Sequence, residues 1–467
     1  MNFTLAQIVD ALNAAHCHAH LHHCTTEQAQ QIQIHTLSTD SRKIVAGSMF
    51  LALRGEQFDA HDFVLSVQEA GAAVVVVEQL HPELTIPAIV VENSLRALQE
   101  IALFHRRQFS LPVIGVTGSN GKTTVKEMIA SILRTQAGTT HSLATQGNLN
   151  NEIGVPLTIL GLQAQHEFAV IELGMNHPGE IACIAKVAAP TVGLVNNAQR
   201  EHQEFMQSVE AVAQENGSVI ASLPEHGVAV FPAQDTYTAL WTNLAQAQGA
   251  RKICTFGLSP DADVSASVVS DAFSSQMQVS LRDQDRLENF TVNLAIAGQH
   301  NVLNALAAIA CTYHVGISIA NIVKGLEAFQ AVKGRLQLKQ SASGLKIIDD
   351  TYNANPDSVR AAIEVLRAIP NETILVLGDM GEVGSDGRAF HHEIGEYARM
   401  NGVQRLFSLG DISLASTQSF GDAAQHFSTL DELLVALDSA VVSQHTVLVK
   451  GSRFMRMERV VEHLLQR

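Results

Sequence analysis

The sequence has few basic residues, few cysteines and no long apolar run, and each shortage excludes a class of protein. Lys and Arg number 30 against 46 Asp and Glu, and the net charge of −16 argues against a surface for nucleic acid or anionic membrane. No stretch approaches the roughly 18 apolar residues of a membrane span, and the N-terminus lacks the features of a signal peptide. The five cysteines are odd in number and scattered, which predicts free thiols in a reducing compartment. We therefore expect a soluble cytoplasmic protein with no nucleic-acid partner and no membrane insertion.

Short β-branched runs alternate with helical patterns along most of the chain, which is typical of α/β proteins with parallel sheets. The segment 122–136 has apolar residues at helical spacing. The segment 259–294 alternates with period two and predicts antiparallel strands at the edge of the middle domain. Continuous apolar runs fit strands covered on both faces, and they occupy residues 72–77, 111–118, 168–174, 191–197, 372–379 and 445–451.

The chain divides into three blocks, because 467 residues exceed what one hydrophobic core normally serves. The first block runs to about residue 90, and the second opens with a helical pattern at 94–108. The third block follows the segment 325–337 and has its own alternation of strands and helices. The predicted domains are residues 1–90, 91–326 and 327–467.

One stretch has the pattern of a phosphate-binding loop between a strand and a helix, with the sequence VIGVTGSNGKTTVKEM at 113–128. Glycines let backbone N–H groups turn toward a phosphate chain, and the helix N-terminus adds positive partial charge. Lys122 is expected to reach the terminal phosphates and Thr123 to bind Mg²⁺. The general pattern has a glycine five positions before Gly121, where this chain has Val116, and the alternative is a strand–turn–helix with incidental glycines. The predicted nucleotide-binding residues are Gly118, Ser119, Asn120, Gly121, Lys122, Thr123 and Thr124.

Two residues at strand ends are candidates for binding a metal ion. Glu172 follows the apolar run FAVI, so its carboxylate is expected at the carboxyl edge of a parallel sheet, where ligands bind. Mg²⁺ prefers oxygen ligands and bridges nucleotide phosphates. The alternative for Glu172 is an ion-paired or strand-capping role. His202 follows a second strand end and belongs either to a second metal site or to the structure alone.

Asparagines are concentrated in two segments. Residues 145–160 place Asn148, Asn150 and Asn151 beside a helix start, and neutral amides can orient a carboxylate or peptide without adding charge. Asn301 and Asn304 stand three apart on one helix face, within reach of a base or ribose. The alternative for this second pair is exposed polar positions on an otherwise apolar helix.

The third block carries polar residues at the ends of its predicted strands. Asp349 and Asp350 end one strand, and Asp379 ends another. Asn355 precedes Pro356, which blocks a helix through Asn355 and starts one directly after it. Each residue alone is ordinary as a solvated loop charge, but their shared placement favours contact with an anionic group. The block also contains Lys333, Arg335, Lys450, Ser452 and Arg453.

Seven motifs, in this order along the chain, resemble those of the Mur ligase family: TGSNGKTT, TQGNLNNEIGVP, IELGMNHPGEI, GQHNVLNALAA, KGRL, DDTYNANP and LGDMGE. The N-terminal segment STDSRKIVAGSMFLALRGEQFDAHDFVLSVQEAGA resembles the domain with which the family holds the UDP-sugar end of its substrate. The resemblance covers nearly the whole chain. ELGMNHPGEI and DDTYNANPDSVRAAIE are more similar to the branch that adds a dipeptide than to relatives that add single amino acids.

The resemblance implies three α/β domains: an N-terminal UDP-sugar domain, a central P-loop-type mononucleotide-binding domain with a parallel sheet, and a C-terminal Rossmann-like domain. It implies an enzyme that uses ATP and Mg²⁺ to convert the terminal carboxylate of UDP-N-acetylmuramoyl-tripeptide into an acyl-phosphate. D-alanyl-D-alanine then displaces phosphate and gives the UDP-MurNAc-pentapeptide of peptidoglycan synthesis. The expected oligomeric state is a monomer.

The resemblance also implies roles for individual residues. Lys122, Glu172 and His202 would be catalytic, and Thr123, Glu172 and His202 would bind metal, with His202 in a second metal site.

Further residues would bind the substrates. Ser41 and Arg42 match the motif that holds the uridine nucleotide sugar. The residues implied to bind ATP outside the phosphate loop are Asn301 and Asn304 near adenosine, and Arg335 and Asp350 from the third domain. Those implied to face the peptide or dipeptide are Asn148, Asn150, Asn151, Tyr352, Asn353 and Asn355.

The sequence departs from the family at one position. Many members carry a carbamylated lysine near the metals, but this chain has no lysine between Lys186 and Lys252, and the matching position is Asn216. Glu215 and Glu210 are the candidates for the missing anion. Separately, the segment 17–24, CHAHLHHC, contains zinc-ligand residue types, but its compact spacing and lack of a paired motif favour a structural or incidental role.

Two other functions compete with this interpretation. A ligase that extends folate with glutamate would share the nucleotide-binding half, but it has no use for an N-terminal UDP-sugar domain. A P-loop regulatory NTPase would not require Asp, Asn, Lys and Arg at the strand ends of the third block.

Overall fold

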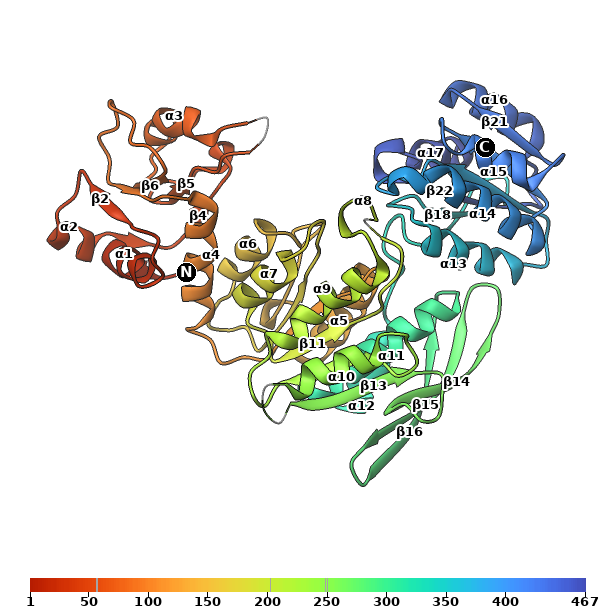
Figure 1. Ribbon diagram of the computed structural model, residues 1–467, viewed down its shortest axis with the longest axis horizontal. Helices are drawn as coiled ribbons and strands as arrows, with labels where there is room; N and C mark the ends of the chain where they lie inside the picture. The colour runs from red at the N-terminus through yellow and green to blue at the C-terminus, as the bar shows by residue number, and fades with distance from the viewer. Residues whose placement is uncertain (56–57, 202, 248, 250) are drawn as a thin grey trace. The chain divides into compact units, whose positions relative to one another are not determined.

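The computed structural model describes residues 1–55, 58–201, 203–247, 249 and 251–467 (Figure 1). The chain forms two compact units, each assembled from three separate stretches. The first unit comprises Met1–Gly115, Thr139–Gly174 and Glu180–Pro190. The second comprises Val116–Gly138, Met175–Gly179 and Thr191–Arg467.

The N-terminal part of the first unit is a five-stranded sheet in the order β2-β7-β6-β5-β4. Strands β4 to β7 are parallel, and β2 joins the edge antiparallel to β7. The central strand β6 is completely buried because apolar clusters cover both faces of the sheet. The strands are β2 (His20–His22), β4 (Leu37–Ser38), β5 (Met49–Leu51), β6 (Val74–Val77) and β7 (Ala88–Val90), with a separate ladder of β1 (Phe3–Thr4) and β3 (Gln33–Ile34).

Helix α4 (Ser94–Arg106) organises the rest of the first unit. It packs against α1 (Leu5–Ala14), α6 (Gly154–Leu160) and α7 (Glu180–Ala188). Its apolar face, which includes Leu98 and Ile101, belongs to the same core as the N-terminal sheet. The remaining elements of this unit are α2 (Thr26–Gln31), α3 (Val64–Glu69), β9 (Ser142–Ala144) and β10 (Phe168–Glu172), of which β9 and β10 are parallel.

The central part of the second unit is a sheet that changes from parallel to antiparallel. Strands β11 to β14 are parallel, whereas β14, β15 and β16 are antiparallel and form one end of the sheet. The prediction for residues 259–294 is therefore confirmed. The strands are β11 (Val192–Val195), β12 (Val228–Pro232), β13 (Lys252–Gly257), β14 (Val264–Ser270), β15 (Ser275–Asp283) and β16 (Arg286–Leu294).

Helix α5 (Lys122–Ala137) confirms the helix predicted at 122–136 and directly follows β8 (Val113–Thr117). It packs against α11 (Gln299–His314) and α12 (Ile319–Glu327). The approach of α12 is close, since a Cβ on Gly325 would lie 2.5 Å from the Cα of Ile132. The other helices here are α8 (Gln203–Met206), α9 (Val209–Ala221) and α10 (Thr238–Gln246).

The C-terminal part of the second unit is a six-stranded sheet in the order β17-β18-β22-β19-β20-β21, with only β17 antiparallel. Separate apolar clusters cover its two faces, one involving α13 and α14 and the other α16 and α17 (Figure 1). The strands are β17 (Gln337–Gln340), β18 (Lys346–Asp350), β19 (Thr373–Gly378), β20 (Arg405–Leu409), β21 (Ala424–Phe427) and β22 (Thr446–Lys450). The helices are α13 (Pro356–Arg367), α14 (Gly387–Met400), α15 (Leu414–Phe420), α16 (Leu430–Ala440) and α17 (Glu458–Leu465).

The α/β class predicted from the alternation of strands and helices is confirmed. Within the described residues, none of the helices is both long and apolar enough to span a bilayer.

Candidate active site

The turn between β8 and α5 depends on two glycines. Gly118 has φ +134° and Gly121 has φ +81°, conformations that side-chain-bearing residues rarely adopt. A Cβ on Gly121 would lie 2.5 Å from Oδ1 of Asn304, and one on Gly118 would lie 3.0 Å from the Cβ of Asn196. Both conformation and space therefore require glycine, and the turn leads directly into the N-terminus of α5, an end of a helix that favours an anion.

Neutral amides from the segment after β11 hold this turn. The Nδ2 of Asn196 donates to the carbonyl of Asn120 at 2.8 Å and to Oδ1 of Asn304 at 2.9 Å. Asn197 accepts from the backbone N–H of Asn120 at 2.8 Å, and Gln199 accepts from the side chain of Asn120 at 2.6 Å. These contacts fix the loop without adding a charge that would compete with a phosphate.

Asn301 and Asn304 extend this amide network from α11. Their exposed fractions are 5% and 4%, so the alternative of exposed polar positions is wrong. Nδ2 of Asn304 donates to Oδ1 of Asn301 at 3.2 Å, and Nδ2 of Asn301 donates to the carbonyl of Ala297 at 2.7 Å. Both residues support the loop, and their contact with adenosine stays a prediction.

Lys122 is folded back onto the loop that precedes it. Its Nζ donates to the carbonyls of Gly118 at 2.5 Å and Ser119 at 3.1 Å. It also forms an ion pair of 3.2 Å with Oε2 of Glu201, which is only 6% exposed. The sequence analysis missed Glu201, although its position directly after the amide-rich strand end could have drawn attention to it.

Arg335 brings the third block to the start of α5. Its Nη2 donates to Oγ1 of Thr123 at 2.9 Å, and its guanidinium lies 4.2 Å from the centre of the Tyr352 ring. Its Nε is buried and has no hydrogen-bond partner within the described residues. Stacking fixes the plane of the guanidinium, so the Arg335 donors remain directed at the phosphate loop.

Asp350 positions two neighbouring groups. Its Oδ2 accepts from Nζ of Lys450 at 2.6 Å, and its Oδ1 accepts from the backbone N–H of Leu336 at 3.1 Å. The same Nζ donates to the carbonyl of Asn353 at 2.9 Å. The buried Lys450–Asp350 pair therefore connects the ends of β18 and β22 to the loop that carries Arg335.

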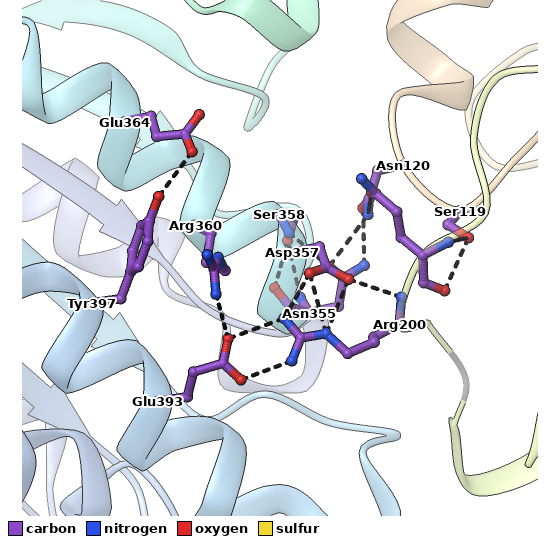
Figure 2. A network of polar contacts seen from close by, with 11 residues as sticks. Ser119, Asn120, Arg200, Asn355, Asp357, Ser358, Arg360, Glu364, Glu393 and Tyr397 are labelled. Atoms are coloured by element: carbon purple, nitrogen blue, oxygen red, sulfur yellow. Dashed lines mark hydrogen bonds and ion pairs between the residues drawn. The ribbon is translucent and has the colours of Figure 1, made fainter. Parts of the chain in front are cut away.

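Asn355 has two roles at the N-terminus of α13. Its Oδ1 accepts from the backbone N–H of Ser358 at 2.8 Å and completes a capping box. The helix begins at Pro356, as the sequence predicted. Its Nδ2 donates to Oδ1 of Asn120 at 2.9 Å, so the helix cap contacts the phosphate loop (Figure 2). The carboxylate of Asp379 instead accepts hydrogen bonds from the backbone N–H groups of Asp411, Ile412 and Ser413, which indicates a structural role.

The candidate metal ligands supply the right donor type. Glu172, at the end of β10, is buried and accepts from Nδ2 of Asn150 at 2.8 Å. Carboxylate and hydroxyl oxygens of the kind offered by Glu172 and Thr123 fit Mg²⁺. The two residues belong to different units, so their sharing of one ion stays a prediction. His202 lies outside the described residues, and among those described no three His, Cys, Asp or Glu side chains gather into a metal-binding group.

Asn216 stands on α9, where it is completely buried. Its Oδ1 accepts from Oγ1 of Thr117 at 2.6 Å, so the amide supports the end of β8. Of the two candidate anions, Glu215 is buried and accepts from the backbone N–H of Gly179 at 2.9 Å, whereas Glu210 is exposed. A contribution of either carboxylate to a metal site stays a prediction.

The remaining candidates lie in the first unit. Asn151 accepts from the N–H of Gly154, the first residue of α6, at 2.8 Å, while Asn148 is exposed. Ser41 is half-buried and Arg42 is exposed in a short turn in which Arg42 binds Asp40 through two nitrogens, at 2.9 and 3.0 Å. The hydrogen bond from the Arg42 side chain lowers the pKa of Asp40 to about 2. All five cysteines are free thiols, as expected.

Three family models match successive parts of the chain. They are described as "Mur ligase family, catalytic domain" over residues 33–106, "Mur ligase middle domain" over 116–312 and "Mur ligase, glutamate ligase domain" over 334–453. With the full-length relatives below, they define the class of enzyme: the chain belongs to the Mur ligase family.

Individual relatives show which members of the family the chain is similar to. The chain is 38% identical to the UDP-N-acetylmuramoyl-tripeptide–D-alanyl-D-alanine ligase of Escherichia coli, across 99% of this chain and 98% of that protein. It is similar to the crystal structure of MurF from Acinetobacter baumannii, with a TM-score of 0.91, 35% identity and coverage of 100% and 99%. The MurF ligase of Thermotoga maritima, solved in complex with ADP, matches with a TM-score of 0.81 and 27% identity over 92% of this chain and 97% of that one.

Proposed function

We propose that this chain is the ligase that joins D-alanyl-D-alanine to the terminal carboxylate of UDP-N-acetylmuramoyl-tripeptide, using ATP and passing through an acyl-phosphate. The product is the UDP-MurNAc-pentapeptide of peptidoglycan synthesis. The observation that carries the proposal is similarity over the full length to enzymes of this specificity. The phosphate loop, with Arg335 of the third block bonded to Thr123, supports it independently.

The first step would take place at the phosphate loop. Backbone N–H groups at the start of α5 bind and orient the phosphate chain of ATP, aided by the helix dipole. Lys122 would leave Glu201 and neutralise charge that develops on the transferring phosphoryl group. Thr123 and Glu172 would hold Mg²⁺, which when bound supplies further neutralisation of phosphate charge.

The second step would use groups of the third block. Arg335 and Lys450 would be the cations of this block that meet the nucleotide. Arg335 already bonds Thr123 of the phosphate loop, and Asp350 keeps Lys450 in place. Asn353 and Asn355 are neutral groups suited to orient the incoming dipeptide, whose free amine attacks the acyl-phosphate carbon and expels phosphate. Excluding water from this site protects the acyl-phosphate from hydrolysis.

The same proposal extends to organisation and location. We assign residues 1–90 to the UDP-sugar end of the substrate, with Ser41 and Arg42 as contacts, residues 91–326 to ATP, and residues 327–467 to the dipeptide. Adenosine would bind near Asn301 and Asn304. Both nucleotide substrates are cytoplasmic metabolites, which supports a cytoplasmic location. We propose a monomer as the oligomeric state.

The experiment that tests the proposal is a phosphate-release assay with Mg·ATP, UDP-MurNAc-tripeptide and D-alanyl-D-alanine, in which each component is omitted in turn. We expect phosphate only in the complete mixture, together with a pentapeptide product identified by mass. Phosphate release without the dipeptide would contradict the assignment and favour a regulatory NTPase. Release with glutamate and a folate instead would favour the folate-extending ligase.

A further inference from the structure

Arg200 joins the segment that holds the phosphate loop to two helices of the third block (Figure 2). Its guanidinium forms paired bonds with both oxygens of Asp357 and both oxygens of Glu393, the shortest being 2.7 Å to each carboxylate. Its backbone N–H also donates to Asp357 at 2.9 Å. Asp357 lies in the first turn of α13 and Glu393 lies on α14. Planar, bidentate pairing of this kind fixes direction as well as distance.

The neighbours of Arg200 in the chain both act on the phosphate loop. Gln199 accepts from Asn120 at 2.6 Å, and its backbone N–H donates to Oγ of Ser119 at 2.8 Å. Glu201 holds Lys122 at 3.2 Å. A displacement of Arg200 would therefore move contacts on both sides of it, at the loop and at the lysine.

The N-terminal turn of α13 touches the phosphate-loop region at two separate points. Asn355 bonds Asn120, and two residues later Asp357 bonds Arg200. The hydrogen bonds that Glu393 and Asp357 accept raise the pKa of Arg200, and the bond that Arg200 donates lowers the pKa of Glu393. The contacts therefore favour the charged forms of Arg200 and Glu393.

We propose that Arg200 is a positioning residue for the ligation reaction: it keeps α13 and α14 in register with the phosphate loop, so that Arg335 and Lys450 meet the same nucleotide that Lys122 binds. This inference rests on the proposed ligase activity and adds a residue to it. The side-chain bonds of Arg200 go to Asp357 and Glu393, neither of which is assigned a part in the reaction. Its effect is on the distance between catalytic groups carried by separate elements, to which rates are steeply sensitive.

The test compares Arg200→Gln with Arg360→Gln. Arg360 is a matched control because it bonds the same Glu393 at 2.8 Å but lies on α13, so its loss leaves the link to the phosphate loop in place. We expect Arg200→Gln to lower kcat by about tenfold and to leave the KM for the UDP-substrate within about twofold, since that substrate is assigned to residues 1–90. Arg360→Gln is expected to retain kcat within about twofold.

A double-mutant cycle separates positioning from general damage. Asp357→Asn should lower kcat like Arg200→Gln, and the double variant should be no slower than the slower single variant, because both remove one contact. Arg200→Lys should recover only part of kcat, since an ammonium cannot bridge two carboxylates in a plane. If Arg200→Gln does not fold, Arg200→Lys and Asp357→Asn carry the same comparison.

Small-angle X-ray scattering tests the positioning role without requiring catalysis, because it measures the radius of gyration. Arg200→Gln is expected to increase the radius of gyration, whereas Arg360→Gln should not. Wild-type kcat and radius in Arg200→Gln, or equal losses in Arg360→Gln, would overturn the inference. A wild-type chain that makes no pentapeptide would overturn the proposed function instead, and the scattering comparison would still decide whether Arg200 holds the helices.

Discussion

At the scale of single residues, the central feature is that Lys122 already has an anionic partner. Glu201 and two loop carbonyls hold its ammonium in the position described above. A phosphate that binds the loop must therefore exchange with a carboxylate of this chain. Because Glu201 is largely buried, we expect the pair to affect stability as well as nucleotide binding.

Lys122→Ala is expected to separate these two effects. Activity should fall at least about 100-fold, because a charge that stabilises the transferring phosphoryl group is lost. Stability should fall by about 2 kcal/mol, because a buried carboxylate loses an ion-pair partner. Adding Glu201→Gln should recover stability but not activity, as measured by urea unfolding and by pentapeptide formation. Lys252→Ala, which breaks the more exposed 2.6 Å pair with Asp283, is the control and should change neither by much.

Gly121→Ala is expected to abolish nucleotide binding. A side chain there meets Asn304 and Asn196 and is strained at φ +81°. Gly138→Ala is the matched control, because Gly138 has φ +89° but open space around its Cβ position. This variant should therefore lose only about 1 kcal/mol of stability, from backbone strain alone. Calorimetric titration with ADP and thermal unfolding provide the comparison. Normal ADP affinity in Gly121→Ala would contradict the role given to the amide network.

The sequence predicted the strand, turn and helix of the phosphate loop well and the contacts around that loop poorly, for a physical reason. Gly118 to Thr123 form a local pattern in which conformation and chemistry follow from adjacent residues. Arg200 and Glu201 were missed because their importance comes from partners 157 and 79 positions away. The alternative of exposure for Asn301 and Asn304 failed because helical spacing shows which residues share a face but not what covers that face.

At the scale of elements, the sequence predicted buried strands more readily than edges. The run 72–77 contains the completely buried β6, and the period-two segment gave the antiparallel strands β14 to β16. Strand β2, His20–His22, was not predicted, because it is three residues long and lies at the sheet edge with both histidines exposed. The order of strands in each sheet was also beyond prediction, since pairing depends on contacts that are distant along the chain.

Asn355→Ala tests the start of α13. The variant loses the side-chain cap and the bond to Asn120, and the lost cap alone should cost about 1 kcal/mol. Ser318→Ala removes the comparable cap of α12, where Ser318 accepts from Asn321, and provides the control. We expect a loss of thermal stability in both variants, at least as large in Asn355→Ala because the bond to Asn120 is lost as well. The ligation rate should fall only for Asn355→Ala. Equal rates in the two variants would argue that Asn355 acts as a cap and nothing more.

Two buried histidines, one on α4 and one on α11, should make the stability of the protein depend on pH. Burial lowers the pKa of His105 on α4 and of His314 on α11 from 6.5 to about 4. In the unfolded chain these histidines take up protons near pH 6.5, whereas in the folded chain they do so only near pH 4. Their contribution to the free energy of unfolding is therefore fully present above pH 6.5 and is lost as the pH falls toward 4. Each histidine contributes a slope of at most about 1.4 kcal/mol per pH unit. Urea unfolding at pH 5 and 7 should show a smaller difference for His105→Gln than for the unmodified chain.

At the scale of the whole molecule, the first unit depends on stretches that lie far apart in the chain. The N-terminal sheet shares its core with Leu98 and Ile101 of α4 and with Leu157 of α6. A boundary at residue 90 therefore passes through one continuous apolar core, although it matches a change in sequence pattern. Cores of this kind cannot be read from local periodicity, because the partners are brought together only by folding.

Removal of residues 1–90 should make the remaining fragment aggregate. The apolar face of α4 would lose its cover and become an exposed patch. Light scattering coupled to size-exclusion chromatography is expected to show large, heterogeneous oligomers for residues 91–467 and a single species of defined mass for the full chain. The same fragment with Leu98→Lys and Ile101→Lys should be less aggregated. A monomeric unmodified fragment would show that the domains are independent at this boundary.

The discontinuity of the first unit also affects how the protein is made. A ribosome delivers the chain from its N-terminus, and domains generally fold as units while synthesis continues. Helix α7, which packs against α4, lies at Glu180–Ala188, after the whole of the phosphate loop and α5. The first unit therefore cannot be completed until Pro190 has emerged from the ribosome. The phosphate loop emerges earlier, so it is exposed while the first unit is still incomplete.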